Sequence, residues 1–219
     1  MPRTEASNRP PAEERSPPPA RGIRCRVAAV ALWLGRWTAV GGPPPLPKFV
    51  VVAAPHTAWM DGFWMLAFAW RWGMSIDFLV KRSATRGPLG WIVPRVGGIA
   101  VDRSSPQGLV GELAREFGKR DRLVLSVPPE GTRARGEYWR SGFYWIAKEA
   151  NVPVCLSYLD YGRRRGGFGP CVVPSDSSSS TSIRADMDRV RAFYRDVRGK
   201  YPERFTPPRL REESEKSEA

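Results

Sequence analysis

Histidine is the scarcest residue with acid–base chemistry in this chain, because the 219 residues include only one, His56. Imidazole is the side chain whose unperturbed pKa lies near neutral pH, so proton transfer by histidine rests on this residue. The three cysteines, Cys25, Cys155 and Cys171, are odd in number and widely spaced. With one histidine they cannot assemble a zinc site of Cys and His ligands. We therefore expect no metal and three reduced thiols.

Long hydrophobic runs are also missing, since no segment reaches the ~20 apolar residues that span a bilayer. The nearest is Val27–Leu34, which follows three arginines and precedes Arg36 and Trp37. Cations at the start, an aliphatic centre and tryptophans at the end favour a membrane-interface helix within residues 21–40. The alternative is an ordinary N-terminal helix of the core.

Negative charge is in the minority, because 22 Asp and Glu residues stand against 35 Lys and Arg residues, for a formal net charge of +13. Such a balance favours an anionic partner: a membrane surface with anionic lipids, nucleic acid or a phosphorylated substrate. The ends, residues 1–20 and 206–219, are rich in Pro, Arg, Glu and Ser. Segments of this kind bury too little apolar area to offset the entropy of ordering them. We expect two disordered tails and one domain over residues 21–205.

Strand-like and helix-like segments alternate between the two ends. Short apolar runs predict strands at residues 48–54, 76–81, 99–103, 123–127 and 152–158. Helical periodicity predicts helices at about residues 22–39, 59–72, 107–119, 138–150 and 182–199. This alternation is typical of the α/β class, with a single central, mostly parallel sheet flanked by helices.

His56 follows the first predicted strand, at the carboxyl end where open α/β sheets usually hold their sites. Asp61 lies shortly after it, at the start of the next helix. Residues five apart on one continuous helix point about 140° from each other, so His56 must lie in the loop before the helix. A carboxylate within reach fixes the imidazole tautomer and stabilises its charged form. The sequence therefore predicts His56 as a general base and Asp61 as its partner.

A turn rich in proline and charge, residues 128–135, directly follows the fourth predicted strand. Its prolines and glycine predict a rigid connection that presents Glu130, Thr132 and Arg133 at the edge of the sheet. The planar fork of Arg133 suits a phosphate or carboxylate, and a backbone amide near Gly131 could donate to an oxyanion.

Two further cations end predicted strands, Arg103 after residues 99–102 and Lys81 after residues 76–80. Together with Arg133 they would form a site for an anionic substrate. For Lys81 the alternative is an exposed, solvated side chain. The aromatic residues of the second helix would line an apolar groove, lie at a membrane interface or form ordinary core: Trp59, Phe63, Trp64, Phe68 and Trp70.

Three motifs, in this order along the chain, resemble those of the glycerolipid acyltransferases, the family of lysophosphatidic acid acyltransferases and their lysophospholipid relatives. They are His56-x4-Asp61, Gly98–Arg103 and Pro129–Arg133, and Val152–Val154 takes the place of a fourth block. The resemblance covers about residues 45–160.

The chain departs from the family pattern at three positions near these motifs. Pro128 replaces the usual aromatic residue before the Pro-Glu-Gly-Thr-Arg block, Ala134 replaces the usual serine after it, and Leu156 replaces a proline in the fourth block. None of these changes removes a catalytic group, but they bear on the choice of acceptor and acyl chain.

The resemblance implies transfer of a fatty acyl group from acyl-CoA or acyl carrier protein to the hydroxyl of a lysophospholipid, most simply 1-acylglycerol-3-phosphate. It implies a peripheral protein of phospholipid biosynthesis on the cytoplasmic face of a membrane. It also implies that Arg103, Glu130 and Arg133 hold the glycerol-phosphate head of the acceptor. A thioester is already activated, so a base suffices and no cofactor beyond the co-substrate is expected.

Other classes of protein compete with this interpretation. A nucleic-acid-binding module would fit the pI near 10.4 and the run Arg163–Arg165, but no zinc-finger or RRM signature occurs. A serine hydrolase would need Gly-x-Ser-x-Gly, which is absent. The alternatives that stay open are a catalytically silent, basic membrane-binding protein and an acyltransferase for another lysolipid. The sequence sets neither the oligomeric state nor the acyl-chain length.

Overall fold

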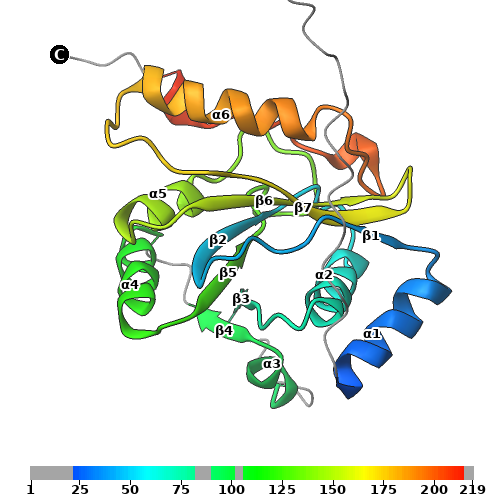
Figure 1. The fold of residues 1–219 in the computed structure, drawn as a ribbon. Helices are drawn as coiled ribbons and strands as arrows, with labels where there is room; N and C mark the ends of the chain where they lie inside the picture. Colours follow the sequence, from blue (N-terminus) through cyan, green and yellow to red (C-terminus); the bar gives the residue numbers. More distant parts are fainter. Residues whose placement is uncertain (1–21, 82–89, 102–105, 215–219) are drawn as a thin grey trace, which may run out of the picture.

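One sheet runs through the protein in the computed structural model, which describes residues 22–81, 90–101 and 106–214 (Figure 1). Within these residues seven strands pair in the order β1-β7-β6-β2-β5-β3-β4. Their bounds are β1 Thr38–Val40, β2 Lys48–Ala53, β3 Asp77–Lys81, β4 Gly98–Val101, β5 Leu123–Val127, β6 Val154–Asp160 and β7 Arg165–Val172.

Five of the strands run in the same direction, because β2 pairs in parallel with β5 and β6, and β3 pairs in parallel with β4 and β5. β7 returns antiparallel to β6, and β1 lies parallel to β7 at the edge. The predicted α/β class with a mostly parallel sheet is confirmed. The carboxyl ends of β2, β5 and β6 meet at one edge, so the loops that follow them are neighbours.

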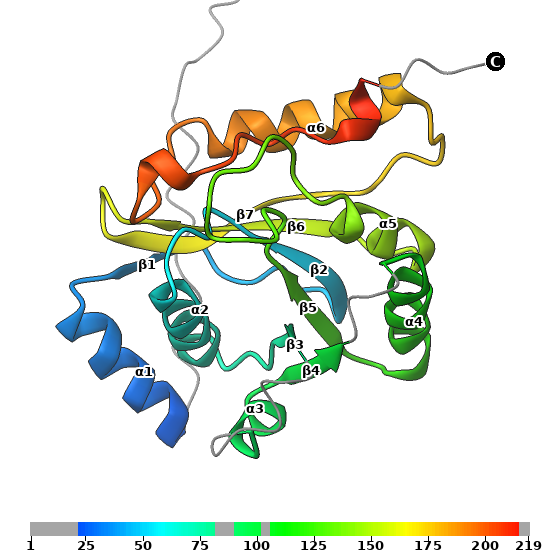
Figure 2. The ribbon, with the colours of Figure 1, turned by 180° about the vertical axis from the view of Figure 1, so that it is seen from behind.

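Helices cover both faces of the sheet (Figures 1 and 2). The first layer holds α4 (Pro106–Lys119), α5 (Gly142–Glu149) and α6 (Ser180–Tyr194). The second holds α1 (Ile23–Leu34) and α2 (Met60–Arg71), while the short α3 (Ile92–Arg95) lies beside β4. Among the described residues, no helix combines the length and apolar character needed to cross a bilayer.

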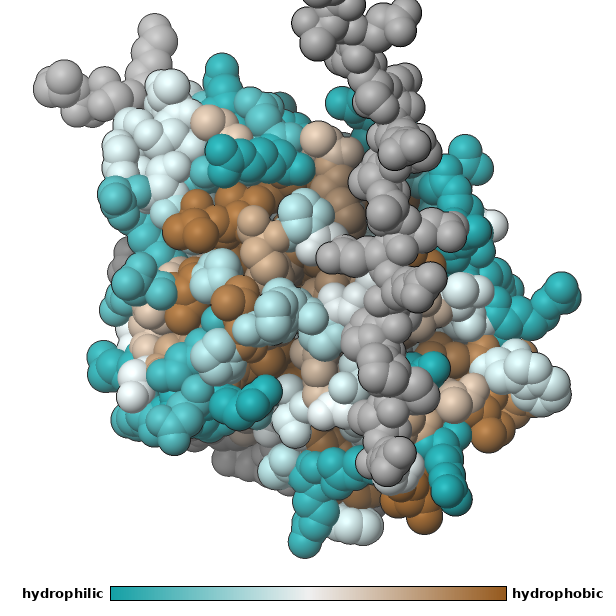
Figure 3. Space-filling view, in the orientation of Figure 1, coloured by the Kyte–Doolittle hydropathy of each residue, from teal (hydrophilic) through white to brown (hydrophobic). Residues whose placement is uncertain are grey.

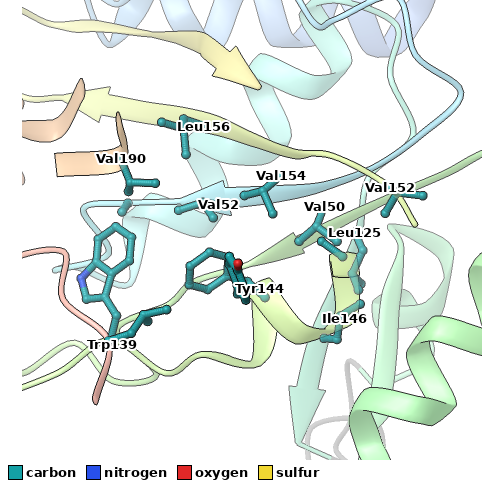
Figure 4. Packing of buried hydrophobic residues seen from close by; sticks show 14 of the residues in the cluster. Val50, Val52, Leu125, Trp139, Tyr144, Ile146, Val152, Val154, Leu156 and Val190 are labelled. Atoms are coloured by element: carbon teal, nitrogen blue, oxygen red, sulfur yellow. The ribbon is translucent and has the colours of Figure 1, made fainter. Parts of the chain in front are cut away.

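The side chains of β2 pack alternately against these two layers, because successive residues of a strand point to opposite faces. Val50 and Val52 join a large buried cluster with residues of α5 and α6, among them Tyr144 and Val190 (Figure 4). Phe49 and Val51 face α2 instead. We call the first the packed face of the sheet and the second the α2 face.

Two strands escaped the sequence analysis. β1 overlaps the end of the residues predicted as the first helix, but the helix itself ends at Leu34, before Arg36 takes a positive φ of 58°. β7 contains glycine and proline, which are depleted in strands. Its Gly167 has a structural reason, since a Cβ there would lie 1.6 Å from the carbonyl oxygen of Val40 on β1.

The C-terminal boundary predicted at residue 206 is wrong. Thr206 and Leu210 are buried, and the indole N–H of Trp139 donates to the carbonyl of Thr206 at 2.7 Å. A short 3-10 helix, Arg211–Glu213, follows, and Arg191 on α6 pairs with Glu213 at 2.7 Å. This segment therefore packs as part of the domain. Residues 1–20, predicted as the other tail, lie outside the described residues.

The expectation of three reduced thiols is also wrong. Cys155 on β6 and Cys171 on β7 form a disulfide, because the antiparallel register places them directly opposite each other. Cys25 is a free, buried thiol on α1. Disulfides persist mainly in oxidising surroundings. The sequence analysis expected a protein on the reducing, cytoplasmic side of a membrane and therefore predicted no disulfide.

Candidate active site

His56 lies in the loop between β2 and α2, at the carboxyl edge of the sheet, as the sequence predicted. The loop is fixed by polar contacts on both sides. The backbone N–H of His56 donates to Glu130 Oε2 at 2.9 Å, and Thr57 Oγ1 accepts from the N–H of Tyr201 at 3.2 Å. The chain following β5 and the C-terminal segment therefore both hold the His56 loop in place.

Asp61 lies in the first turn of α2 and its side chain is 3% exposed. Its Oδ2 accepts from the backbone N–H groups of Thr57 and Ala58 at 2.8 and 2.7 Å. Its Oδ1 accepts from the hydroxyl of Tyr161 at 2.6 Å. These donors stabilise a buried carboxylate at the N-terminus of a helix, where negative charge is favoured.

The predicted pair of His56 and Asp61 is brought together. His56 Nδ1 lies 3.6 Å from Asp61 Oδ2, which is an ion-pair distance and slightly longer than a hydrogen bond. Hydrogen bonds of catalytic groups are often long without substrate and shorten when it binds. Because Nδ1 faces the carboxylate, the other ring nitrogen is the one available to a substrate.

The surroundings of His56 favour its neutral form. Burial lowers the pKa of the imidazole, and the positive charge of Arg133 lowers it further, while Asp61 raises it. The net direction is downward from the ordinary value near 6.5. A neutral imidazole at physiological pH is ready to accept a proton, as a general base must be.

Glu130 is buried beneath the His56 loop rather than presented to solvent, with a side chain that is 3% exposed. Burial raises the pKa of this carboxyl to about 7, and the charge of Asp61 also raises it, while the N–H of His56 opposes the shift. At the carboxyl edge of the sheet, Oε2 of Glu130 accepts from the backbone N–H of His56. The geometry therefore connects Glu130 to the position of His56 and not to an exposed head group.

The turn after Glu130 presents its next residues to solvent. The N–H of Gly131, which has a φ of 67°, closes the turn by donating to the carbonyl of Pro128 at 3.2 Å. That amide is thus engaged and not aimed at an oxyanion. Thr132 accepts from the N–H of Ala134 at 3.3 Å. Arg133 is exposed, and its charge acts on His56, so a cation stands at the mouth of the site.

The two other predicted cations are less defined. Lys81 is the last residue of β3 and pairs in register with Val101 of β4, so its backbone lies at the same edge of the sheet. Arg103 lies outside the described residues. Contacts of Lys81 and Arg103 with a head group stay predictions.

An apolar cavity opens beside His56 and Asp61 and extends between α2 and the sheet. Its volume is about 830 Å³ when the space open to solvent is included. Its walls include Met65, Phe68, Trp72, Ile76, Phe78 and Phe168. Apolar walls of this kind are typical of sites for apolar ligands.

The aromatic residues of α2 divide between the interpretations that the sequence left open. Phe68 lines the cavity, whereas Trp64 packs against Trp37 with ring centroids 5.4 Å apart. Trp59 and Phe63 are exposed. The helix therefore supplies cavity wall, core and surface at once.

The sequence analysis assigned no role to Tyr161, although this residue reaches Asp61. One signal was available, because Tyr161 directly follows a strand whose carboxyl end lies at the same edge as His56. That signal alone does not tell which way the side chain points.

Comparison with known proteins identifies the family of this chain and a similar fold. Residues 39–156 match the Acyltransferase family, and the protein belongs to that family. The fold is similar to the crystal structure of the 1-acyl-sn-glycerophosphate (LPA) acyltransferase PlsC from Thermotoga maritima, with a TM-score of 0.52. That match covers 76% of this chain and 74% of the other, at 18% sequence identity, so the likeness is one of fold. No curated protein matches the sequence.

Proposed function

We propose that this protein transfers a fatty acyl group from an acyl thioester to the hydroxyl of a lysophospholipid, with 1-acylglycerol-3-phosphate as the acceptor. The observation that carries the proposal is the position of His56. A base with a lowered pKa stands between an apolar cavity, an exposed arginine and a buried carboxylate. The cavity would take an acyl chain, the arginine would bind a phosphate, and the carboxylate would act as the partner of a catalytic imidazole.

The reaction follows from this arrangement. As the acceptor oxygen attacks the thioester carbonyl carbon, Nε2 of His56 takes the hydroxyl proton, and Asp61 stabilises the resulting imidazolium. The tetrahedral intermediate then collapses, the carbon–sulfur bond breaks, and the proton passes from His56 to the leaving thiolate. The products are an ester and a free thiol, and no group of the protein is consumed.

The cavity on the α2 face is the proposed site of the acyl chain. His56 and Asp61 are among the residues that line it, so a chain within it would bring the thioester carbon to the base. Ser126 on β5 and Ser157 on β6 are among the few polar groups in its wall. Ser157 donates to the carbonyl of Val52, so its hydroxyl is already satisfied.

The phosphate of the acceptor is proposed to bind Arg133. A guanidinium presents a fork of donors that matches a phosphate, and it lies at the mouth of the site. Lys81 and Arg103 remain candidates for the same phosphate. Glu130 is proposed to act through the backbone of His56, which it holds by a hydrogen bond of 2.9 Å.

A membrane surface is the proposed source of both lipids. Helix α1 exposes Ile23, Val27, Val30, Trp33 and Leu34, and Figure 3 shows hydrophobic side chains over this helix at the lower right. Gly35 at the end of α1 lies against Trp64, whose ring contacts that of the exposed Phe63 with centroids 5.0 Å apart, and Trp59 at the start of α2 is also exposed. An apolar surface of this kind, beside the mouth of the site, suits an interfacial contact with lipid.

The test measures thiol release from two donors, long-chain acyl-CoA and acylated acyl carrier protein. Each donor is assayed alone, with 1-acylglycerol-3-phosphate and with a second phosphorylated lysolipid. We expect release that requires an acceptor and falls at least ~10²-fold in His56→Ala, because the base is lost. A matched thermal melt checks that the variant is folded. Release that ignores both the acceptor and His56 would refute the proposal, and no release with either donor would favour the silent membrane-binding protein.

A further inference from the structure

The hydroxyl of Tyr161 is the only side-chain donor to Asp61 among the described residues. It donates to Oδ1 at 2.6 Å, while Oδ2 takes two backbone N–H groups and faces the imidazole of His56. One oxygen of the carboxylate is thus held by the phenol, and the other is directed at the base. A contact this short to an ionised acceptor belongs to the strong class of hydrogen bonds.

The phenol is itself held rigidly. The ring of Trp37 meets the ring of Tyr161 edge to face, with centroids 4.9 Å apart and an interplanar angle of 83°. The backbone N–H of Tyr161 donates to the carbonyl of Arg198 at 2.8 Å. Trp37 and Tyr161 both lie outside residues 39–156, which match the family. Segments from both sides of the matched region therefore converge on the catalytic carboxylate.

We propose that Tyr161 is a positioning residue for the His56–Asp61 pair: its hydroxyl fixes the orientation and tunes the charge of the Asp61 carboxylate that faces the imidazole. This inference rests on the proposed function, in which His56 is the base. Without the hydroxyl, Oδ1 would lose its donor and the carboxylate would be free to turn about its terminal bond.

The phenol also acts on the charge that His56 experiences. Its O–H dipole points its positive end at Asp61 and offsets part of the negative charge that attracts a protonated imidazole. Removing that dipole strengthens the attraction and raises the pKa of His56. The other charged groups that face His56 are Glu130 and Arg133, and Tyr161 also lies near Arg164 and Tyr201. None of these is altered by removal of the hydroxyl.

The experiment compares Tyr161→Phe with a matched control, Tyr144→Phe. Tyr144 donates to the buried carboxylate of Asp186 at 2.9 Å, so the control also loses a tyrosine–aspartate hydrogen bond, on the packed face away from His56. Because the chain contains one histidine, an NMR titration of protein labelled at histidine follows His56 without assignment. This titration needs no substrate.

We expect the pKa of His56 to rise in Tyr161→Phe and to stay at the wild-type value in Tyr144→Phe. In thiol-release assays, kcat of Tyr161→Phe should fall on the order of tenfold with KM values retained, as for other supports of a catalytic group. An unchanged or lowered pKa of His56 would overturn the inference. Inactive wild-type protein with a shifted titration would instead count against the proposed function alone, so the two failures are distinguishable.

Discussion

The two faces of the sheet are built for different purposes. On the packed face, side chains from β2, β5 and β6 interlock with α4, α5 and α6, and even the polar pair of Tyr144 and Asp186 is closed by the N–H of Ser175 at 2.9 Å. On the α2 face the buried cluster is small and a cavity remains. Close packing stabilises a fold, whereas a preformed cavity gives up contacts that would otherwise stabilise it.

Buried ionisable groups at the edge of the sheet beside the cavity also lower the stability of the fold. Glu130 is buried with a pKa raised to about 7, and the pKa of His56 is lowered. Both shifts mean that burial disfavours the charged form of the group. Stability thus resides mainly on the packed face, and the α2 face with its adjoining edge holds the candidate active site.

The largest expected effect concerns Glu130, because a pKa raised from 4.5 to about 7 corresponds to about 3 kcal/mol. The folded protein binds this proton more tightly than the unfolded chain. The free energy of unfolding contributed by Glu130 is therefore highest at low pH and falls as the pH rises from about 4.5 to about 7. Urea unfolding of wild type and Glu130→Gln across this range measures it.

The quantity to follow is the difference between the two proteins, because His56 has the opposite dependence and titrates in both. Its lowered pKa makes its contribution rise with pH. If the difference in unfolding free energy between wild type and Glu130→Gln is flat over this range, the pKa of Glu130 is not raised as described.

One substitution made on each face tests the comparison directly. Ala147 lies in the packed cluster and Ala69 lines the cavity, and both are buried. Ala147→Leu should destabilise the protein by about 1–3 kcal/mol through overpacking. Ala69→Leu can extend into existing space, so it should change stability less and shift the preference toward shorter acyl chains.

The measurements are urea unfolding of both variants and thiol release with acyl-CoA donors of graded length. Equal destabilisation by the two substitutions would remove the distinction between the faces. An unchanged chain preference in a folded Ala69→Leu protein would show that the acyl chain does not occupy the cavity.

The smallest of the three effects is expected for Arg133→Ala, which removes the proposed phosphate ligand outside the cavity. We expect KM for the acceptor to rise about tenfold, or about 1.4 kcal/mol, with kcat retained. Arg135→Ala, an exposed arginine of the same turn, is the matched control and should leave KM unchanged. Assays near pH 8 keep His56 neutral in every variant. A change confined to KM for the thioester donor would contradict the assignment.

The regular part of the sheet was predictable because its strands are short apolar runs between turns. β5 has the predicted bounds of 123–127, and β2 ends one residue before the predicted end. β7 was missed because its glycines and proline oppose strand formation until a neighbour supplies the pairing. The order of Thr206 and Leu210 was missed because composition does not reveal that Trp139 and α6 provide partners for them.

The position of the candidate site was predictable where its residues directly follow predicted strands. His56, Asp61 and Glu130 follow strands that lie side by side, and the fold brings them together. The inward direction of Glu130 was not predictable, because it depends on backbone hydrogen bonds with His56 and Thr206, which lie far from it along the chain. The cavity leaves no mark in the sequence, since it consists of space that neighbouring side chains do not fill.

The disulfide between Cys155 and Cys171 makes the hairpin of β6 and β7 a covalent ring. The tip of this hairpin carries three exposed arginines, Arg163, Arg164 and Arg165, each a cleavage site for trypsin. A cut at the tip would leave two fragments that migrate together on a gel without reductant and separate when thiol is added. Gel migration with and without reductant therefore shows whether the ring has been opened at the backbone, at the disulfide or at both.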